Sequence, residues 1–226
     1  MALEDDDYTQ ARERMLAEIT ALVIFNCGRL GKAALGRRVL EVLAEVPRHV
    51  FVPLDMQPYA YADSPLPIGC GKTISQPFIV ATMTDLLDPQ PDDRLLDIGT
   101  GLGYQTAVLS RLVGHVYSVE LIEALSLGAR QRLRQLGCDN VTLRVANGHH
   151  GWPEEAPFDK IIVSAAPEEV PPALLDQLAP GGRLVLPAGP AEHPQLLVID
   201  KAPDGLLRRR DVFAVRFSSL EDTAPR

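Results

Sequence analysis

The chain has 226 residues, of which 46% are hydrophobic, which fits one domain with a full core better than two independent domains. Its formal net charge of -8 argues against nucleic-acid binding through a general basic field. The three cysteines, Cys27, Cys70 and Cys138, are far apart and odd in number, which argues against a disulfide framework and favours free thiols in a reducing compartment.

The first third of the chain is predicted to be helical. The acidic start, residues 1–8, does not have the pattern of a signal peptide, and the longest early apolar run, residues 21–25, is too short to cross a membrane. We therefore expect a cytoplasmic protein with no membrane partner. Apolar residues then recur at helical spacing within residues 12–25 and within residues 37–46, where Pro47 ends the second helix.

A long ordered loop is expected after these helices. Residues 51–74 are rich in proline, tyrosine and glycine and show no periodicity, and ordered loops of this length often carry function. A further helix is expected over residues 76–87, with Pro77 near its start.

From residue 93 onward, short apolar strands alternate with helices. The expected strands cover residues 94–98, 115–119, 141–145, 160–164, 183–187, 195–200 and 211–217. The expected helices cover residues 104–113, 122–136 and 172–178. Such alternation predicts a parallel sheet covered on both faces, and the turn at residues 203–205 predicts a closing antiparallel hairpin. We expect one α/β domain over residues 1–226 with a doubly wound, mostly parallel seven-stranded sheet, in which residues 1–92 form helices and a substrate loop and residues 93–226 form the ligand-binding core.

The strongest motif is a glycine-rich turn between the first of these strands and its helix. Gly99, Gly101 and Gly103 let the backbone turn sharply and approach a ligand closely. Glu120 follows about 20 residues later, where a carboxylate can accept hydrogen bonds from ribose hydroxyls. The alternatives are a tight turn without a ligand and a solvated glutamate.

The spacing G-x-G-x-G and the antiparallel end of the sheet argue against a dinucleotide fold. The combination resembles the class I S-adenosylmethionine-dependent methyltransferases, with S-adenosyl-L-homocysteine as product. After the third strand, Asn147 occupies the turn that borders the adenine in that class, although a plain Asn-Gly turn is the alternative. The cofactor-binding residues that the resemblance implies are Asp97, Gly99, Thr100, Gly101, Gly103, Glu120, Leu121, Asn147 and Gly148.

The loop before the sheet narrows the resemblance further. Residues 62–77 read A-D-S-P-L-P-I-G-C-G-K-T-I-S-Q-P, and this is similar to the protein-L-isoaspartate O-methyltransferase family, which carries P-L-P-I-G followed by G-x-T-I-S-Q-P. The similarity covers roughly residues 35–217, with further blocks at residues 46–53, 97–104, 151–154, 158–163, 165–167 and 180–185.

The family resemblance implies the site residues on the acceptor side. Ser75 and Thr73 would border the reacting methyl group and the acceptor carboxylate, with Ser75 most closely tied to catalysis. A helix N-cap is the alternative role for Ser75. The substrate-binding residues implied are Ile74, Cys70, Ala165, Ala166, Pro167 and Ser218.

The activity implied is methyl transfer from S-adenosylmethionine to the free carboxylate of L-isoaspartyl residues in damaged proteins or peptides, by a monomer or weak oligomer. A carboxylate has a pKa of about 4, so the acceptor is already ionised at neutral pH and needs no general base. The protein must supply in-line placement and partial desolvation, which explains why the motifs carry hydroxyls and glycines without an acid–base pair.

Three departures from the family pattern qualify this reading. Ser218 and Ser219 replace a Val-Pro pair after the last strand, Cys70 takes a position that is often polar or aromatic, and Asn147 replaces a common aspartate. A methyltransferase for a dedicated peptide and an inactive binding module are the alternatives. Adjacent histidines at 149–150 do not predict a metal site, and three arginines at 208–210 are more typical of a protected edge strand than of a nucleic-acid contact.

Overall fold

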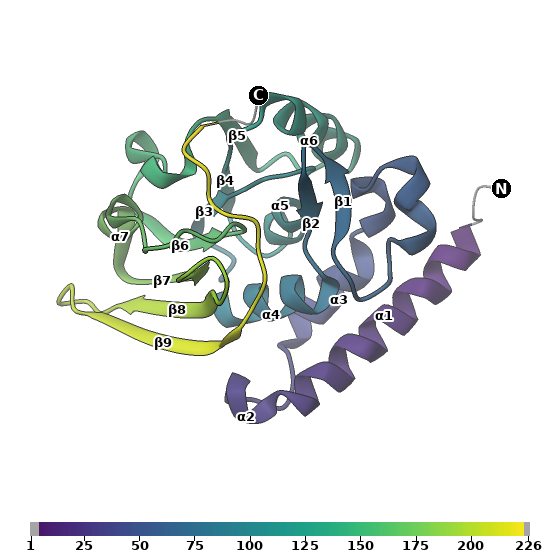
Figure 1. The fold of residues 1–226 in the computed structure, drawn as a ribbon, viewed down its shortest axis with the longest axis horizontal. Coiled ribbons are helices and arrows are strands. Elements are labelled where there is room, and N and C mark those ends of the chain that lie inside the picture. The colour runs from purple at the N-terminus through teal and green to yellow at the C-terminus, as the bar shows by residue number, and fades with distance from the viewer. Residues whose placement is uncertain (1–4, 224–226) are drawn as a thin grey trace.

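The computed structural model describes residues 5–223, so residues 1–4 of the acidic start lie outside the described residues (Figure 1). Within this range no helix is long and apolar enough to cross a membrane. The helices are α1 (Asp5–Phe25), α2 (Cys27–Leu30), α3 (Arg37–Glu45), α4 (Pro77–Leu87), α5 (Tyr104–Ser110), α6 (Glu123–Gln135) and α7 (Pro172–Gln177). Four 3-10 helices are η1 (Arg48–Phe51), η2 (Leu54–Tyr59), η3 (Gly148–His150) and η4 (Pro153–Glu155).

The main sheet has the predicted doubly wound, mostly parallel architecture. Its strands are β3 (Arg94–Ile98), β4 (His115–Glu120), β5 (Val141–Val145), β6 (Phe158–Val163), β7 (Leu178–Ala188), β8 (Gln195–Lys201) and β9 (Leu207–Ala214). They lie in the order β5-β4-β3-β6-β7-β8-β9, with β5 to β7 parallel and the β8–β9 hairpin antiparallel at one edge. The order reverses between β4 and β6 on either side of β3, and this reversal opens a crevice at the carboxyl ends of these strands.

The central strands β3, β4 and β6 are buried on both faces, whereas the edge strand β5 is partly exposed. On β6, Ile162 packs into one apolar cluster with residues of α4 and α5, while its neighbours Ile161 and Val163 pack into a second cluster with Leu174 of α7. Alternate residues of a strand point to opposite faces, so one strand serves both layers. The strands are thereby held rigidly, and the loops at their carboxyl ends have fixed starting points.

The predicted long loop is more regular than its sequence indicates. Residues 66–74 form a small antiparallel hairpin of β1 (Leu66–Gly69) and β2 (Lys72–Ile74). Cys70 adopts a φ of 51° between two glycines that also have positive φ, and this turn allows the chain to reverse. Such short strands with proline and glycine have no clear alternation, so the predicted ordered loop did not include this strand pair.

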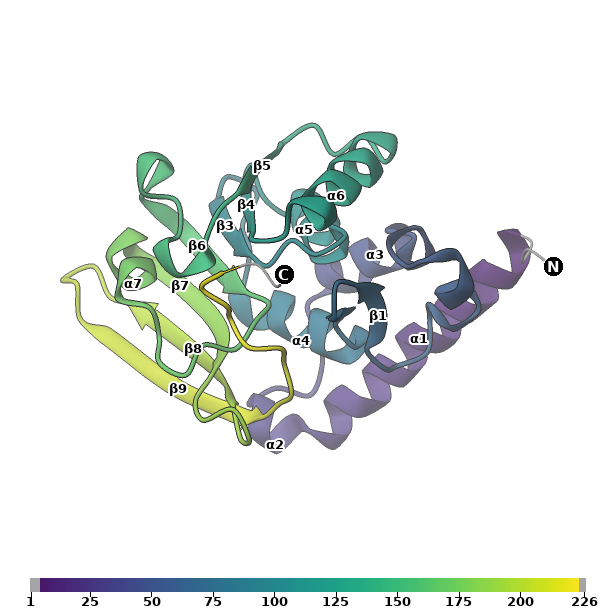
Figure 2. The same cartoon turned by 45° about the horizontal axis from the view of Figure 1, so that its top comes forward.

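The last strand also differs from the prediction. The ladder of β9 begins at Leu207, directly after the turn that Ala202 and Leu206 close with a backbone hydrogen bond of 2.8 Å. β9 thus covers Leu207–Ala214, whereas the predicted strand covered residues 211–217. Residues 215–221 leave the sheet and run past the β1–β2 hairpin, as Figures 1 and 2 show; we call this segment the strap.

Candidate functional site

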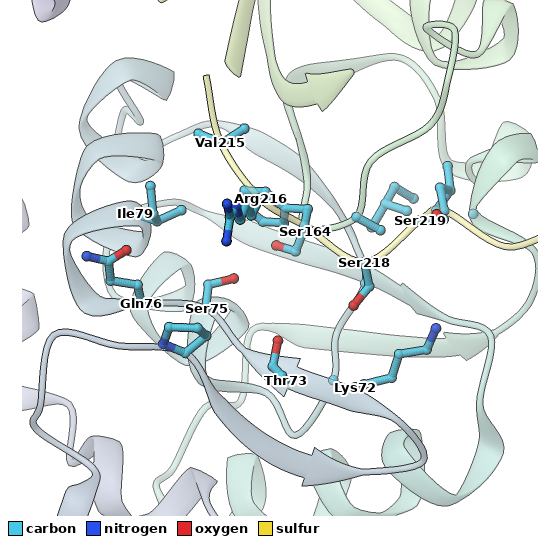
Figure 3. A pocket seen from close by; sticks show the side chains of 18 of the residues that line it. Lys72, Thr73, Ser75, Gln76, Ile79, Ser164, Val215, Arg216, Ser218 and Ser219 are labelled. Atoms are coloured by element: carbon cyan, nitrogen blue, oxygen red, sulfur yellow. The ribbon is translucent and has the colours of Figure 1, made fainter. Parts of the chain in front are cut away.

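A cavity of about 800 Å³ lies at the carboxyl ends of β3, β4 and β6, where the strand order reverses (Figure 3). The glycine-rich turn, the end of β4 and the start of α6 line one part. The β1–β2 hairpin, the start of α4, the strap and the end of α1 line the rest. Of the residues predicted from sequence, those that line the cavity are Thr73, Ser75, Gly99, Gly101, Glu120, Leu121, Gly148, Ala165 and Ser218.

The glycine-rich turn has the backbone form that the motif predicted. Gly99, Gly101 and Gly103 all have positive φ, from 56° to 97°, which side chains other than glycine rarely adopt. A Cβ on Gly101 would also lie 3.2 Å from Ile68 of the hairpin, and a Cβ on Gly103 would lie 3.3 Å from Ala129 of α6. The turn is therefore held closely between the hairpin and α6, with its backbone open to the cavity.

Glu120 lies at the end of β4 and is only 7% exposed, so it is not the solvated glutamate that was the alternative. One carboxylate oxygen accepts the N–H of Gly101 at 2.8 Å, and the other accepts the N–H of Ile122 at 3.0 Å. A carboxylate oxygen can accept more than one hydrogen bond. The side chain thus fixes the glycine-rich turn and still offers acceptor positions to a ligand.

Asp97 and Thr100 lie behind the cavity wall instead of lining it. Asp97 is fully buried, and its Oδ2 accepts hydrogen bonds from Thr106 at 2.6 Å and Ser118 at 2.9 Å. Thr100 shares a 2.6 Å hydrogen bond with Ser118. The other oxygen of Asp97 is buried with no hydrogen-bond partner among the described residues. Burial raises the pKa of Asp97 to about 6, against the lowering effect of the two hydroxyls.

This pKa makes the stability of the protein depend on pH. In the unfolded chain Asp97 ionises near pH 4, whereas in the folded chain it keeps its proton until about pH 6. Protonated Asp97 therefore contributes stability that is complete below pH 4 and is lost as the pH rises through 6. We expect Asp97→Asn, which never ionises, to gain up to about 3 kcal/mol relative to the parent between pH 4 and 7.

Urea unfolding of the ligand-free protein at pH 4, 5, 6 and 7 measures this difference. Asp139→Asn, at an exposed position, is the matched control and should give a constant difference. Parallel curves for Asp97→Asn and the parent would show that Asp97 ionises normally in the folded protein.

The turn after β5 is split between the cavity and the surface. Gly148 lines the cavity, and a Cβ there would lie 2.5 Å from Ile98. Asn147 does not line it. Its Oδ1 accepts the N–H of His149 at 2.8 Å and its Nδ2 donates to Asp222. Asn147 therefore forms a local cap at η3, which favours the plain-turn alternative over the predicted adenine contact.

Four hydroxyl groups converge in the middle of the cavity. Figure 3 shows the oxygens of Thr73, Ser75, Ser164 and Ser218 facing the same open space from the hairpin, β6 and the strap. Ser164 was not among the residues predicted to form the site. Its N–H donates to Ile98 at 2.7 Å, so it continues the parallel ladder beyond the last residue of β6. A polar residue at the carboxyl end of a central strand was the signal that could have identified it.

Ser75 does not cap helix α4, which was its alternative role. The N-cap position belongs to Gln76, and the helix receives its side-chain acceptor from Asp63, whose Oδ1 accepts the N–H of Phe78 at 2.8 Å. The backbone of Ser75 is fixed from the other side by Arg48. This fully buried side chain donates to the carbonyl oxygens of Ser75 at 2.7 Å and Ala60 at 2.8 Å.

The strap is attached to the sheet and to the hairpin. The N–H of Ala166 donates to Ser218 at 2.8 Å, and the N–H of Leu220 donates to Ala166 at 2.9 Å. Lys72 of β2 forms an ion pair with Glu221 at 2.6 Å. The strap and the hairpin therefore enclose the cavity from opposite sides.

The remaining predicted residues lie near the cavity without lining it. Ala166 holds the strap by its backbone, and Cys70 is exposed at the tip of the hairpin. The predicted residues outside the lining are Asp97, Thr100, Gly103, Asn147, Cys70, Ile74, Ala166 and Pro167. Among residues 5–223, no group of three His, Cys, Asp or Glu side chains could hold a metal ion.

Comparisons with known proteins point to one family. A family model described as Protein-L-isoaspartate(D-aspartate) O-methyltransferase (PCMT) matches residues 29–224. The chain is 53% identical over 223 residues to Protein-L-isoaspartate O-methyltransferase 1 of Polaromonas sp., covering 99% of this chain and 94% of that protein. It is 54% identical over 178 residues to Protein-L-isoaspartate O-methyltransferase 2 of Syntrophobacter fumaroxidans, covering 79% of this chain and 72% of that protein.

Solved structures show the same fold. A protein-L-isoaspartate O-methyltransferase structure matches with a TM-score of 0.79 and 28% identity, over 94% of this chain and 67% of that chain. A Plasmodium falciparum structure of this kind, in complex with S-adenosyl-L-homocysteine, matches with a TM-score of 0.76 and 23% identity, over 96% of this chain and 99% of that chain.

Proposed function

This chain belongs to the protein-L-isoaspartate(D-aspartate) O-methyltransferase family, and we propose that its cavity transfers methyl groups from S-adenosylmethionine to the free carboxylate of L-isoaspartyl residues in damaged proteins and peptides. One observation carries the assignment of the site residues. The acidic residue and glycines suited to a nucleoside line the same cavity as four hydroxyls suited to a carboxylate. The methyl donor and the acceptor carboxylate can therefore bind side by side in one cavity.

The residues present fit S-adenosylmethionine. Glu120 can accept from the two ribose hydroxyls, and the open backbone at Gly99 and Gly101 leaves room for the amino-acid part of the cofactor. The apolar side chains Ile98 and Leu125 line the same part of the cavity and suit a flat adenine ring. When bound, the sulfonium supplies an activated methyl group.

The protein itself then has to orient one anion. The hydroxyls of Ser75 and Thr73 can donate to the acceptor carboxylate, and Arg48 keeps the Ser75 backbone in place through its carbonyl oxygen. No proton has to be removed, because the acceptor is ionised at neutral pH. The strap and hairpin exclude water from the carboxylate, which raises its reactivity toward the methyl group.

The test is methyl transfer from labelled S-adenosylmethionine to a set of matched peptides. We expect transfer to hexapeptides that contain L-isoaspartate and none to the same peptides with aspartate. Transfer to neither peptide, with cofactor binding intact, would favour a dedicated peptide substrate. Loss of both transfer and cofactor binding would favour the binding module.

The strap leads to a prediction about substrate affinity. Ser218 and Ser219 stand where the family commonly has Val-Pro, and the N–H of Ser219 makes no hydrogen bond among the described residues, so a proline there would remove no hydrogen bond. We expect Ser218→Val with Ser219→Pro to lower the Michaelis constant for an isoaspartyl hexapeptide about three- to tenfold. Proline reduces the ordering cost by up to ~1 kcal/mol, and a valine that the bound peptide covers contributes roughly 1–2 kcal/mol.

Steady-state kinetics of the parent and the double variant on one peptide decide this prediction, with the change expected in the Michaelis constant more than in turnover. Equal Michaelis constants would mean that the two serines are a neutral departure.

We also place the enzyme in a reducing compartment such as the cytoplasm. Its cysteines, Cys27, Cys70 and Cys138, are all free, which supports this placement.

A further inference from the structure

Three of the charged side chains that line the cavity already have partners. Glu120 accepts two backbone N–H groups, and Lys72 pairs with Glu221. Within residues 5–223, Arg29, Arg216 and Glu192 line the same cavity without an ion pair or a side-chain hydrogen bond. The cavity therefore keeps two unpaired guanidinium groups against one unpaired carboxylate, in a chain whose overall charge is -8.

Arg216 comes from the strap, next to the hydroxyl cluster. The N–H of Val215 donates to Pro194 at 2.9 Å, which ties the start of the strap to the loop that carries Glu192. Figure 3 shows the guanidinium of Arg216 on the side of the cavity where Ile79 and Gln76 lie, away from Lys72. It is exposed, so it can exchange water for a ligand at small cost.

Arg29 comes from α2, which packs against β9 just before the strap begins. Its neighbours in the cavity wall are Leu22 and Asn26 of the α1 end. These two residues precede residue 29, where the match to the family model begins. This wall is distant in the fold from the glycine-rich turn, so its charges face the part of the cavity left for the substrate chain.

We propose that Arg29 and Arg216 form an arginine pair that recognises an acidic side chain next to the isoaspartyl residue of the substrate. This inference rests on the proposed function and names a preference within it. A guanidinium matches a carboxylate with two parallel N–H donors, so an acidic neighbour is a better partner for it than an amide or an amine. Glu192 would then disfavour a second acidic residue on its own side.

The acceptor carboxylate itself is the less suitable partner for the pair. A guanidinium that neutralised the acceptor would weaken its attack on the methyl group, whereas hydroxyls can orient the carboxylate without removing its charge. The hydroxyls of Thr73, Ser75, Ser164 and Ser218 already face one another in the middle of the cavity. The arginine pair is therefore assigned to a neighbouring residue of the substrate, and its effect should fall on the Michaelis constant.

The experiment compares three isoaspartyl hexapeptides that differ only in one residue beside the isoaspartate: glutamate, glutamine or lysine. We expect the parent to have a Michaelis constant about fivefold lower for the glutamate peptide than for the glutamine peptide, as for one partly exposed ion pair, with the lysine peptide weakest. The preference should shrink in 0.5 M salt, since screening weakens exposed pairs. Arg29→Gln with Arg216→Gln should remove it, so that the glutamate and glutamine peptides have equal Michaelis constants.

Arg130→Gln, at an exposed position on α6 outside the cavity, is the matched control and should keep the preference. An unchanged preference in the double variant, or none in the parent, would overturn the proposal. A fall in turnover on all three peptides would also overturn it, because Arg216 would then act on the acceptor carboxylate. Calorimetric binding of the glutamate and glutamine peptides tests the arginine pair even if no isoaspartyl peptide is methylated, so its failure is distinct from that of the proposed function.

Discussion

Replacing Ser75 with alanine is expected to lower the rate constant for methyl transfer by roughly 10²-fold, equal to about 2.7 kcal/mol of barrier, with the fold and cofactor affinity retained. The hydroxyl faces the middle of the cavity, and it has no role in capping α4, which Gln76 and Asp63 provide. Removing it therefore takes away a donor to the acceptor carboxylate without removing a helix contact.

Single-turnover kinetics with saturating S-adenosylmethionine and an isoaspartyl hexapeptide measure the chemical step directly. Ser219→Ala is the matched control, because Ser219 lies on the strap outside the group of four hydroxyls in Figure 3 and should keep the parental rate. Thermal unfolding of both variants should agree with the parent. If Ser75→Ala transfers methyl groups within about twofold of the parent, a barrier change of only ~0.4 kcal/mol, Ser75 has no part in the chemistry.

The sheet was predictable because its signals are local, and so was the position of Gly99, Gly101 and Glu120 in the cavity wall. Gly99, Gly101 and Gly103 follow one strand directly, and Glu120 ends the next strand, so strand order alone brings them together. The alternation of strands and helices also follows from the hydrophobic pattern of short sequence segments. It predicted the parallel sheet and its closing hairpin.

The acceptor side depends on contacts between distant residues, and local patterns do not show these. Ser218 joins the hydroxyl cluster only because the strap returns across the end of β6, where the N–H of Ala166 donates to its carbonyl oxygen. The helix cap from Asp63 and the buried Arg48 that holds Ser75 are also long-range. The family motif therefore led to the proposal of Ser75 but did not point to Arg48, which fixes its backbone.

Glu120→Ala is expected to weaken S-adenosylmethionine binding by on the order of 2–3 kcal/mol, or roughly 30- to 150-fold in the dissociation constant. The alanine removes the acceptors proposed for the ribose hydroxyls at a position that is only 7% exposed, where water cannot fully replace them. It also leaves the N–H groups of Gly101 and Ile122 without their partner. Part of the loss should therefore come from a less ordered glycine-rich turn.

Two measurements separate these causes. Thermal unfolding of the parent and of Glu120→Ala without cofactor measures the stability lost when the two N–H groups lose their partner. Calorimetric titration with S-adenosyl-L-homocysteine then reports the affinity, and any loss beyond the change in unfolding free energy belongs to the ribose contacts. Glu123→Ala, at an exposed acidic residue in the first turn of α6, is the matched control and should bind the ligand normally.

Glu120→Ala leaves the acceptor side untouched. Its turnover at saturating cofactor should therefore stay near the parental value, while its Michaelis constant for the cofactor rises. Unchanged affinity in Glu120→Ala would mean that Glu120 only braces the glycine-rich turn and that the ribose is bound elsewhere.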